Sequence, residues 1–503
     1  MDPGSRQLAP FDGRVPPPSF VSIETTRYCG LQCRMCLQFH DGTTVAGPHM
    51  PLEQFERIAE QLFPLVERWQ PSVSGEPLQT QNFERMLAIA ASFGVRLTMF
   101  TNGMLLNDGA IERLAPALDT LMVSFDGATQ ETFEFIRQGA VFEEVKARLR
   151  RAIQHCRAHL PADQQPQFGL SFTMMERNIR ELPALVRLAA EELGVDFVTC
   201  GHMSPPSPEM EPQALAHHPE LAADCIERAR AVAEELGIDL RIGEIHEIRR
   251  QDFEPPHDAA VAARRAALAA RWTFPVRPLE AGSAPELAGM PWCPFLWDRT
   301  YVAIGGDVRP CCVPDSPVVG NLEQDSFEAI WNGPLYRHMR QRLVCDDPAP
   351  ICRGCVHVKR LDDPTRAARL LLGSRLPTAQ ELDPLPAELD PTRLHQGRAG
   401  PPPVLTWEHD PAALRYVVEC SLDGGSLLYS TDGPRGGPAI RDNRYEVPPW
   451  AWRHAPTDRR ILWRVIAKTA AGDRVVSSGS LASVQEPDGR SPSSPQGPTR
   501  EAR

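Results

Sequence analysis

The sequence predicts an α/β protein: a partial (βα)6 TIM-like barrel, followed by a small cysteine-rich domain and an all-β sandwich. Three observations predict this fold. Strand-like and helical patterns alternate between residues 20 and 242, nine of the 13 cysteines fall into two groups, and short strand patterns separated by glycine turns occupy residues 404–480. Strands and helices that alternate at this rhythm are typical of right-handed βαβ units around a parallel sheet.

The predicted barrel consists of seven short strand segments with six amphipathic segments between them. Six βα units fit an open barrel better than a closed barrel of eight units. The expected strands are residues 20–25, 72–74, 96–101, 120–124, 167–173, 197–200 and 239–242, and the expected helices are residues 52–68, 82–93, 110–117, 142–155, 179–193 and 219–236.

Composition and charge limit the classes of function. A chain of 503 residues buries a large core without disulfide bonds. Its net charge of −12 argues against nucleic-acid binding, which needs a basic surface. No apolar run is long enough to cross a membrane. Clustered thiols without an export signal indicate a reducing, cytoplasmic setting.

Changes in composition predict the domain limits. The segments rich in proline, alanine or acidic residues are expected to be linkers rather than core elements. We expect a flexible arm at 1–18, the barrel at 19–245, a linker helix and the cysteine-rich domain at 246–375, a Pro-rich linker at 376–403, the sandwich at 404–485 and a disordered tail at 486–503.

The first cysteine group is Cys29, Cys33 and Cys36, which follow the first strand at C-x3-C-x2-C spacing. Three thiolates can hold three irons of a four-iron cluster, and the fourth iron then stays open for a small molecule. A zinc site or a set of buried thiols explains this spacing about as well when it is considered alone.

Polar residues follow several of the predicted strands, at the carboxyl ends where ligands of parallel sheets bind. The runs are Ser74–Gly75–Glu76, Thr101–Asn102–Gly103, Ser124–Phe125–Asp126 and Cys200–Gly201–His202. Each run by itself also reads as an ordinary turn or helix cap. Their recurrence at successive strands, after a cysteine loop, favours a binding site.

Over residues 20–242 these motifs together resemble the radical S-adenosylmethionine (SAM) enzymes. The resemblance implies a SAM-binding 4Fe–4S cluster on Cys29, Cys33 and Cys36. It also implies that Glu76 holds the SAM amino group, in a turn whose usual Gly-Gly-Glu reads Ser-Gly-Glu here. The implied SAM-binding residues are Met35 (adenine), Gly75, Glu76, Asn102, Ser124 (ribose), Asp126 and Arg137 (carboxylate).

The second cysteine group combines a predicted hairpin with a C-x2-C pair, which is also how zinc ribbons are built. After the first motif it resembles the SPASM or twitch extension of radical SAM enzymes, which carries extra clusters. That resemblance implies one auxiliary 4Fe–4S cluster, with Cys312 and Cys345 as substitute ligands. The implied ligands are Cys293, Cys311, Cys352 and Cys355.

Cys200 ends the sixth predicted strand, where its thiol could face the site. Some radical SAM epimerases use a cysteine as a hydrogen-atom donor, so Cys200 is the candidate catalytic residue. A core thiol is the alternative that burial statistics favour. His202 reads either as a base or as a loop residue.

The predicted sandwich resembles a fibronectin type III domain with Trp407 and Trp463 in its core. Such a fold carries no chemistry of its own, so a binding or spacer role is the default.

The resemblance implies an enzyme that reductively cleaves SAM to a 5′-deoxyadenosyl radical, which abstracts a hydrogen atom from a substrate carbon. A single auxiliary cluster favours oxidation of a small polar molecule, such as a sugar or aminocyclitol. Crosslinking or epimerisation of a ribosomal peptide is the alternative. A flavodoxin- or ferredoxin-like protein would donate the electron. A zinc-stabilised, non-catalytic binding protein is the alternative of another class, but it leaves Glu76, Ser124 and Arg137 unexplained.

Overall fold

The computed structural model divides the chain into two compact units, residues 1–390 and 391–503, and we describe each by itself. Parts of three predicted segments lie outside the described residues: 246–286, 383–403 and 486–503. The structure describes residues 9–38, 48–243, 287–382 without 314, 315, 354, 356 and 373, and then 404–422, 427–430, 440, 443–446, 461–469 and 472–481.

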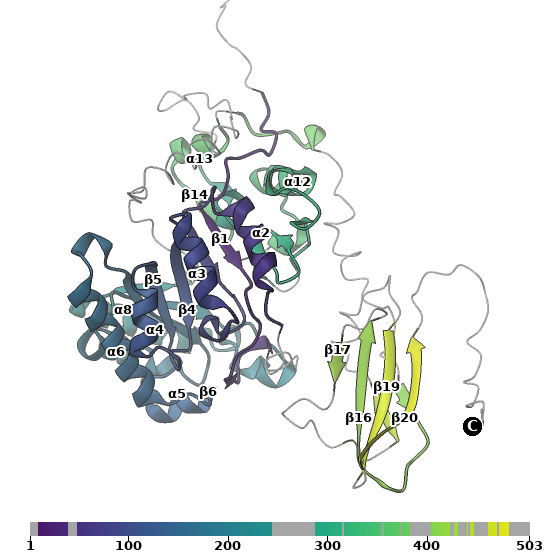
Figure 1. The fold of residues 1–503 in the computed structure, drawn as a ribbon. Helices are drawn as coiled ribbons and strands as arrows, with labels where there is room; N and C mark the ends of the chain where they lie inside the picture. Colours follow the sequence, from purple (N-terminus) through teal and green to yellow (C-terminus); the bar gives the residue numbers. More distant parts are fainter. Residues whose placement is uncertain are drawn as a thin grey trace, which may run out of the picture. The chain divides into compact units, whose positions relative to one another are not determined.

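The first unit contains a ten-stranded sheet (Figure 1). Seven strands of the predicted barrel are parallel, and a strand from the second cysteine region pairs in parallel with β1 on its free side. A short antiparallel hairpin completes that edge. In chain order the strands are β1 (Phe20–Ile23), β3 (Arg68–Pro71), β4 (Arg96–Thr101), β5 (Leu118–Ser124), β7 (Gln167–Met174), β8 (Phe197–His202), β9 (Asp239–Ile242), β11 (Arg299–Val302), β12 (Asp307–Arg309) and β13 (Gly320–Asn321).

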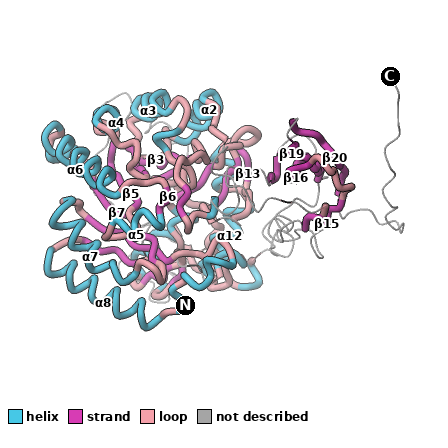
Figure 2. The backbone as a smooth tube through the Cα atoms, turned by 90° about the horizontal axis from the view of Figure 1, so that it is seen from below, coloured by secondary structure: helices cyan, strands magenta, loops and turns pink. Residues whose placement is uncertain are grey.

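Helices follow the strands and form an arc around the outer face of the sheet (Figure 2). Asn107 caps α4 through its side chain, and Thr129 does the same for α5. Gly237, in the left-handed conformation, ends α8. The helices are α2 (Leu52–Leu62), α3 (Phe83–Ser92), α4 (Asp108–Leu114), α5 (Gln130–Ile136), α6 (Phe142–His159), α7 (Leu182–Arg187), prolonged by a π-helical turn (Leu188–Leu193), and α8 (Pro219–Leu236).

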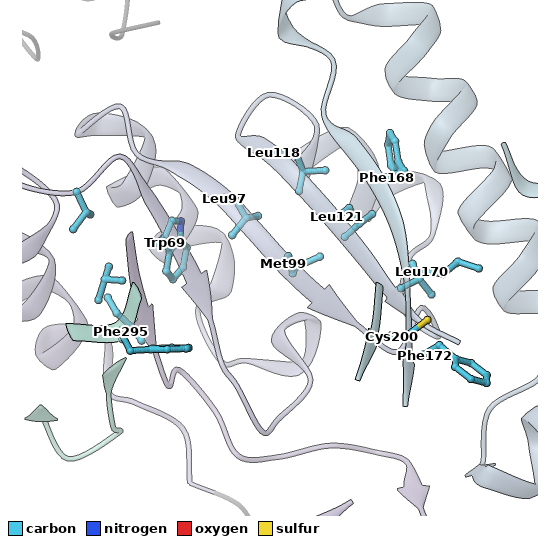
Figure 3. Packing of buried hydrophobic residues seen from close by; sticks show 14 of the residues in the cluster. Trp69, Leu97, Met99, Leu118, Leu121, Phe168, Leu170, Phe172, Cys200 and Phe295 are labelled. Carbon is cyan, nitrogen blue, oxygen red and sulfur yellow. The ribbon is translucent and has the colours of Figure 1, made fainter. Parts of the chain in front are cut away.

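Side chains alternate between the two faces of the sheet. The apolar side chains pack into one continuous core with the helices, as Figure 3 shows for Trp69, Met99 and Phe172. The residues between them are largely polar and face the inner side, for example Gln70 and Ser171, both buried. The inner side of the barrel is therefore polar, while its outer side forms the core.

Two predicted elements need correction. The strand expected at residues 72–74 is β3, at Arg68–Pro71, and the helix expected to reach Arg68 ends at Leu62. β3 lacks an apolar pattern in the sequence because Arg68 faces the polar inner side. There Arg68 pairs with Asp119 at 3.1 Å.

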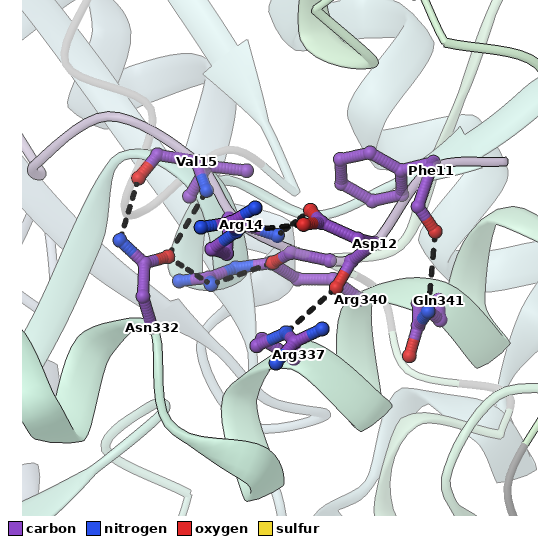
Figure 4. A network of polar contacts seen from close by, with 9 residues as sticks. Phe11, Asp12, Arg14, Val15, Asn332, Arg337, Arg340 and Gln341 are labelled. Atoms are coloured by element: carbon purple, nitrogen blue, oxygen red, sulfur yellow. Dashed lines mark hydrogen bonds and ion pairs between the residues drawn. The ribbon is translucent and has the colours of Figure 1, made fainter. Parts of the chain in front are cut away.

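The predicted flexible arm is wrong over residues 11–18, because this segment packs against the second cysteine region (Figure 4). Phe11 and Val15 are fully buried. The buried Arg340 donates to the carbonyl oxygen of Gly13 at 3.0 Å, and the Asn332 side chain bonds to both backbone groups of Val15. Burial of apolar side chains therefore orders this segment, although its polar, Pro-rich sequence predicted a flexible arm.

The second cysteine region contains the predicted hairpin, β11 and β12, with Gly306 at a φ of +84° in its turn. An antiparallel pair and four helices surround it. They are β10 (Met290–Trp292) with β14 (Lys359–Leu361), and α10 (Pro294–Trp297), α11 (Phe327–Trp331), α12 (Pro334–Val344) and α13 (Pro364–Leu370). No helix in the described part of the chain is long and apolar enough to cross a membrane.

The second unit consists of small antiparallel sheets, as the sequence predicts. A four-stranded sheet runs in the order β17–β16–β19–β20, and β15 pairs with β18. Trp407, Tyr416 and Val465 lie in one buried cluster that both sheets line, and Trp463 packs against it. The strands are β15 (Val404–Thr406), β16 (Ala413–Leu422), β17 (Leu427–Ser430), β18 (Arg444–Glu446), β19 (Ile461–Thr469) and β20 (Gly472–Leu481).

Candidate functional site

The cysteine loop lies at the carboxyl end of β1 and is held by a short antiparallel pair, β2 (Gln32–Cys33) and β6 (Arg137–Gln138). Cys33 pairs in register with Arg137, and the Cys36 amide donates to the Cys33 carbonyl oxygen at 3.0 Å. Cys33 is buried, and Cys29 and Cys36 are half-buried. The segment after β5 therefore sets the shape of the cysteine loop.

Two side chains direct donors at these sulfur atoms. The Asn102 amide donates to Cys29 Sγ at 3.8 Å, and the Arg137 guanidinium donates to Cys33 Sγ at 3.8 Å. Burial raises the pKa of Cys33 to about 12, although Arg137 opposes this. Without iron the thiol therefore stays protonated, and iron binding must displace its proton. Donors aimed at the sulfurs suit the thiolate state.

The three thiols influence one another: both Cys36 and Cys29 raise the pKa of Cys33. Among the described residues, no three Cys, His, Asp or Glu side chains are close enough to hold a single metal ion. A four-iron cluster offers a separate iron to each thiolate, so its ligands need not converge on one atom. Three neighbouring thiols in one loop match that set of ligands.

Glu76 lies in the turn after β3, buried beside this loop. Its Oε1 accepts from the Thr101 hydroxyl at 2.7 Å and from the Leu78 amide at 3.3 Å, and its Oε2 accepts from the Asn102 amide at 2.8 Å. Burial raises the pKa of Glu76, and these donors oppose the shift. Because Oε2 accepts a single bond, it keeps a lone pair for one more cationic donor.

Gly75 brings this turn against the segment that leads into the cysteine loop. A Cβ on Gly75 would lie 2.8 Å from the carbonyl carbon of Thr26 and 2.9 Å from the Tyr28 oxygen. The Glu76 amide donates to the same Tyr28 oxygen at 2.8 Å. A glycine is required here for close approach of two backbones, which the sequence alone could not show.

Asp126 and Arg137 form a buried ion pair, with 2.6 Å between Oδ2 and Nη2. Asp126 Oδ1 also accepts from the Thr173 amide at 2.6 Å. Burial raises the pKa of Asp126, and Arg137 lowers it. The Arg137 Nε is buried and has no hydrogen-bond partner among the described residues. Arg137 thus offers a spare donor, while its Nη2 pairs with Asp126.

The remaining predicted SAM contacts lie around this centre. Ser124 ends β5, is half-buried and stands in register with Ser171 on the inner face. Met35, in the cysteine loop, packs against a small cluster of Ile136, Met175 and Met203. Ser124 is therefore a polar residue of the inner face, whereas Met35 has apolar surroundings.

Taken together, these residues fit SAM bound to a cluster. An amino acid zwitterion needs an acceptor for its ammonium group and a donor for its carboxylate. Glu76 Oε2 can accept one more bond and Arg137 Nε can donate one, and both residues lie near the cysteine loop, where each contributes to the electrostatics of its thiols. An acceptor and a donor of the kinds that SAM needs therefore lie near the three thiols.

The expected role of Cys200 is not supported, because the structure turns its side chain away from the inner face. Cys200 pairs in register with Phe172, is fully buried and belongs to the apolar core that the helices cover (Figure 3). Thr199 and Gly201 face the opposite side by strand alternation. His202, at the end of β8, is exposed.

The second cysteine group gathers the four predicted auxiliary ligands. Burial raises the pKa of Cys293, and the thiols of Cys352, Cys311 and Cys355 raise it further. The pKa of Cys352 is raised to about 12, chiefly by burial, and the thiols of Cys311 and Cys355 contribute to this rise. Four thiols that influence one another fit a closed four-iron cluster with no open position.

The two substitute ligands have different surroundings. Cys345 donates to the carbonyl oxygen of Pro377 at 3.2 Å, and its charged neighbours are Asp347, Arg342 and Glu381. Cys312 is a direct neighbour of Cys311, whose thiol raises the pKa of Cys312 after burial does, and Glu24 and Arg299 act on it as well.

Sequence reasoning missed three residues of this region: Glu24, Thr101 as a partner of Glu76, and Tyr301. Glu24 is almost fully buried directly after β1. A carboxylate at the end of a parallel strand is the signal that could have identified it. Tyr301 lies 277 positions away from Glu24, and only the fold brings the two together.

Comparisons with known proteins agree with this geometry. Residues 23–160 match the model of the Radical SAM superfamily, and residues 293–356 match the SPASM model, described as an iron–sulfur cluster-binding domain. The first match contains the cysteine loop, Glu76 and Arg137, and the second contains the four auxiliary thiols. The match to an iron–sulfur domain argues against the zinc alternative.

The chain is 25% identical to the mycofactocin maturase MftC of Mycobacterium ulcerans over 377 residues, 73% of this chain and 88% of that protein. It is 26% identical to the PqqA peptide cyclase of Granulibacter bethesdensis over 181 residues, 36% of this chain and 46% of the relative. SuiB of Streptococcus suis bound to S-adenosylmethionine aligns with a TM-score of 0.44 and 16% identity over 64% of this chain and 68% of that chain.

The fold and the site define an enzyme that binds 4Fe–4S clusters and SAM. More particularly, it combines a radical SAM domain, in a partial barrel, with a SPASM domain and small antiparallel sheets.

Proposed function

We propose that this enzyme cleaves SAM reductively and uses the resulting radical to modify a peptide. The observation that carries the proposal is the placement of Glu76 and Arg137, with a spare acceptor and a spare donor, beside the three thiols of the cysteine loop. When bound, the cluster and SAM supply a 5′-deoxyadenosyl radical that takes a hydrogen atom from a substrate carbon.

The protein's own part is binding and orientation. Glu76 accepts the SAM ammonium group, and Arg137 donates to its carboxylate while Asp126 fixes the guanidinium. Asn102 and Arg137 stabilise the thiolates by donating to their sulfurs. Ser124 and Met35 hold the ribose and adenine ends. Each of these groups is held by neighbours before SAM arrives, so little reorganisation is needed.

For the substrate, we favour a ribosomal peptide over the small polar molecule that the sequence analysis preferred. The name of one relative states that it acts on a peptide, PqqA, and another relative, which this chain covers over 88% of its length, is named a maturase. The earlier preference rested on a predicted single auxiliary cluster, which does not report directly on the substrate.

The four thiols Cys293, Cys311, Cys352 and Cys355 would hold one auxiliary cluster, which accepts an electron from the substrate or anchors it. A flavodoxin- or ferredoxin-like protein would supply the electron for SAM cleavage. We propose a reducing, cytoplasmic setting, in which clustered thiols stay available for iron.

For the second unit we propose a fibronectin type III-like domain that binds or spaces a partner. Its Trp407 and Tyr416 rings pack edge to face at 5.2 Å. The Asp410 amide donates to the Tyr416 hydroxyl at 2.6 Å, as in the tyrosine corner of such sandwiches.

The test begins with anaerobic purification and reconstitution of the full chain. We expect about eight irons and eight sulfides per chain, and 5′-deoxyadenosine when SAM and dithionite are added. Cys33→Ala should abolish 5′-deoxyadenosine, whereas Cys225→Ala, a buried thiol of α8, should not. Zinc without iron, or cleavage at the wild-type rate in Cys33→Ala, would contradict the proposal.

The substrate class needs a separate test. A short peptide gene next to this gene would supply a candidate, to be incubated with the enzyme and SAM and analysed by mass spectrometry. Deuterated solvent separates the net reactions, because epimerisation incorporates deuterium and dehydrogenation does not. Turnover of a sugar alcohol but of no peptide would favour the small-molecule alternative.

A further inference from the structure

Glu24 joins elements from both cluster-binding regions of the chain. It lies directly after β1, is 1% exposed, and its Oε1 accepts from the amides of Val73 and Ser74 at 3.3 and 3.2 Å. Its Oε2 accepts from the Tyr301 hydroxyl at 2.7 Å and is 3.5 Å from the Ser74 hydroxyl. All these donors belong to the turn before Glu76 or to β11.

Tyr301 reaches Glu24 because β11 extends the barrel sheet. β11 pairs in parallel with β1, so that Ser22 stands opposite Tyr301, and the Glu24 amide donates to the Val302 carbonyl oxygen at 2.8 Å. Tyr301 lies within the SPASM match, between the predicted ligands Cys293 and Cys311. One hydroxyl from the auxiliary-cluster region thus contacts the carboxylate that holds a turn of the SAM-binding region.

The turn that Glu24 holds would not keep its shape unaided. Ser72, at its start, has a φ of +61°, a left-handed conformation that costs a non-glycine residue roughly 1 kcal/mol. The Ser72 hydroxyl bonds to the backbone of Thr26 at 3.0 Å. Further on, Gly75 is pressed against the backbone of Thr26 and Tyr28. Outside contacts must therefore fix the strained segment.

Burying a carboxylate between two strands costs desolvation free energy. Apolar side chains of similar volume at the positions of Glu24 and Tyr301 would hold β1 and β11 together at less cost. Amide and hydroxyl donors that point at the two oxygens need an acceptor, however, and the amide donors lie just before Gly75 and Glu76, while the Tyr301 hydroxyl comes from β11. The carboxylate serves the geometry of the turn.

We propose that Glu24 and Tyr301 are positioning residues for the SAM-binding turn, so that SAM affinity depends on a side chain of the auxiliary-cluster region. The inference rests on the proposed function, since it takes Glu76 as the group that receives the SAM amine. Tyr301 fixes Glu24, Glu24 fixes the amides of Val73 and Ser74, and those amides fix the place of Glu76 Oε2.

The experiment measures SAM binding to the reconstituted full chain by equilibrium dialysis with radiolabelled SAM. Tyr301→Phe removes one hydroxyl and keeps the ring. We expect its Kd for SAM to rise about threefold to tenfold, as expected for partial loss of a hydrogen bond to a charged group. Dithionite-driven cleavage at saturating SAM should stay within about twofold of wild type, because the thiols and Arg137 are unchanged.

The matched control is Tyr336→Phe. Tyr336 shares a hydrogen bond with Thr300, the neighbour of Tyr301 on β11, at 2.9 Å, but does not contact Glu24. It should bind SAM with wild-type affinity. Glu24→Gln keeps an acceptor for the two amides and should weaken binding to a similar degree. The double variant Tyr301→Phe/Glu24→Gln should be no weaker than the weaker single variant, because both changes act on one contact.

Several outcomes would overturn the inference. One is a Tyr301→Phe enzyme that binds SAM as tightly as wild type; others are additive losses in the double variant, or equal weakening in Tyr336→Phe. Parallel loss of auxiliary iron and thermal stability in Tyr301→Phe would make its role purely structural. A wild-type chain that neither binds nor cleaves SAM would instead refute the proposed function, and the inference with it.

Discussion

A single added methyl group at Gly75 should uncouple the SAM-binding turn from the cysteine loop. In Gly75→Ala, the new Cβ would lie 2.8 and 2.9 Å from backbone atoms of Thr26 and Tyr28, and closer still to the Thr26 carbonyl oxygen, whereas ordinary contact begins at 3.4 Å. All these neighbours are backbone atoms, so no side chain can swing away. The turn and the loop must move apart.

The size of the effect follows from that geometry. Overpacking of this kind costs about 1–3 kcal/mol of stability. A shift on the order of 1 Å between groups that bind one ligand reduces rates by about 100-fold. We therefore expect Gly75→Ala to lower the unfolding midpoint of the iron-free chain and to reduce SAM cleavage by roughly two orders of magnitude, with a large rise in the Kd for SAM.

The matched control is Gly305→Ala in the turn of the β11–β12 hairpin, where an added Cβ meets nothing within 4 Å. Thermal unfolding, iron content and 5′-deoxyadenosine formation should be measured for both variants. Gly305→Ala should match the wild type in all three. If Gly75→Ala also cleaves SAM within about twofold of the wild-type rate, the close approach does not position the site, and the reasoning fails.

Three further predictions concern the charged groups and the thiols. Arg137→Met should destabilise the iron-free chain by about 3–5 kcal/mol, because Asp126 stays buried without a partner; adding Asp126→Asn should restore most of the loss in urea unfolding, and additive losses would contradict the ion pair. Burial raises the pKa of Glu76 above its usual 4.5, so this carboxyl stabilises the fold most when protonated, and that contribution disappears as the pH rises through the raised pKa. The melting temperature of the iron-free wild type relative to Glu76→Gln should therefore fall as the pH rises from 4.5 through the raised pKa, and a rising difference would refute the shift. Cys352→Ala should remove about half of the iron, whereas Cys345→Ala should keep all of it, and iron analysis that shows equal losses would contradict the proposed ligand set.

Much of the barrel could be predicted because its elements are locally encoded. The expected limits of α8 and β9, residues 219–236 and 239–242, agree with the structure. The Gly237 that follows α8 ends it in the left-handed conformation, which is a local effect. β3 was placed wrongly because its inward side chains are polar, and only their partner Asp119 makes Arg68 compatible with a buried strand.

The sequence located some residues of the site but did not determine which way others face. The cysteine loop and Glu76 could be located because spacing along the chain and the end of a strand are properties of the sequence. The side that Cys200 faces stayed open between the site and the core, because the face that a strand residue occupies depends on register with its neighbours. A shift of one position exchanges the core for the inner face. Asp126 was expected to contact SAM, which stays a prediction, and the structure adds an ion pair with Arg137 that the sequence did not predict.

The sequence by itself determined the chemistry that is available: two sets of thiols at spacings suited to iron–sulfur clusters, and charged residues at successive strand ends. The tertiary structure alone decided which groups meet. Tyr301 reaches Glu24 across 277 positions, the N-terminal segment is ordered by Arg340, and Gly75 touches the backbone of Thr26. Local spacing is fixed by covalent geometry, whereas close approach and side-chain facing depend on how distant segments pack.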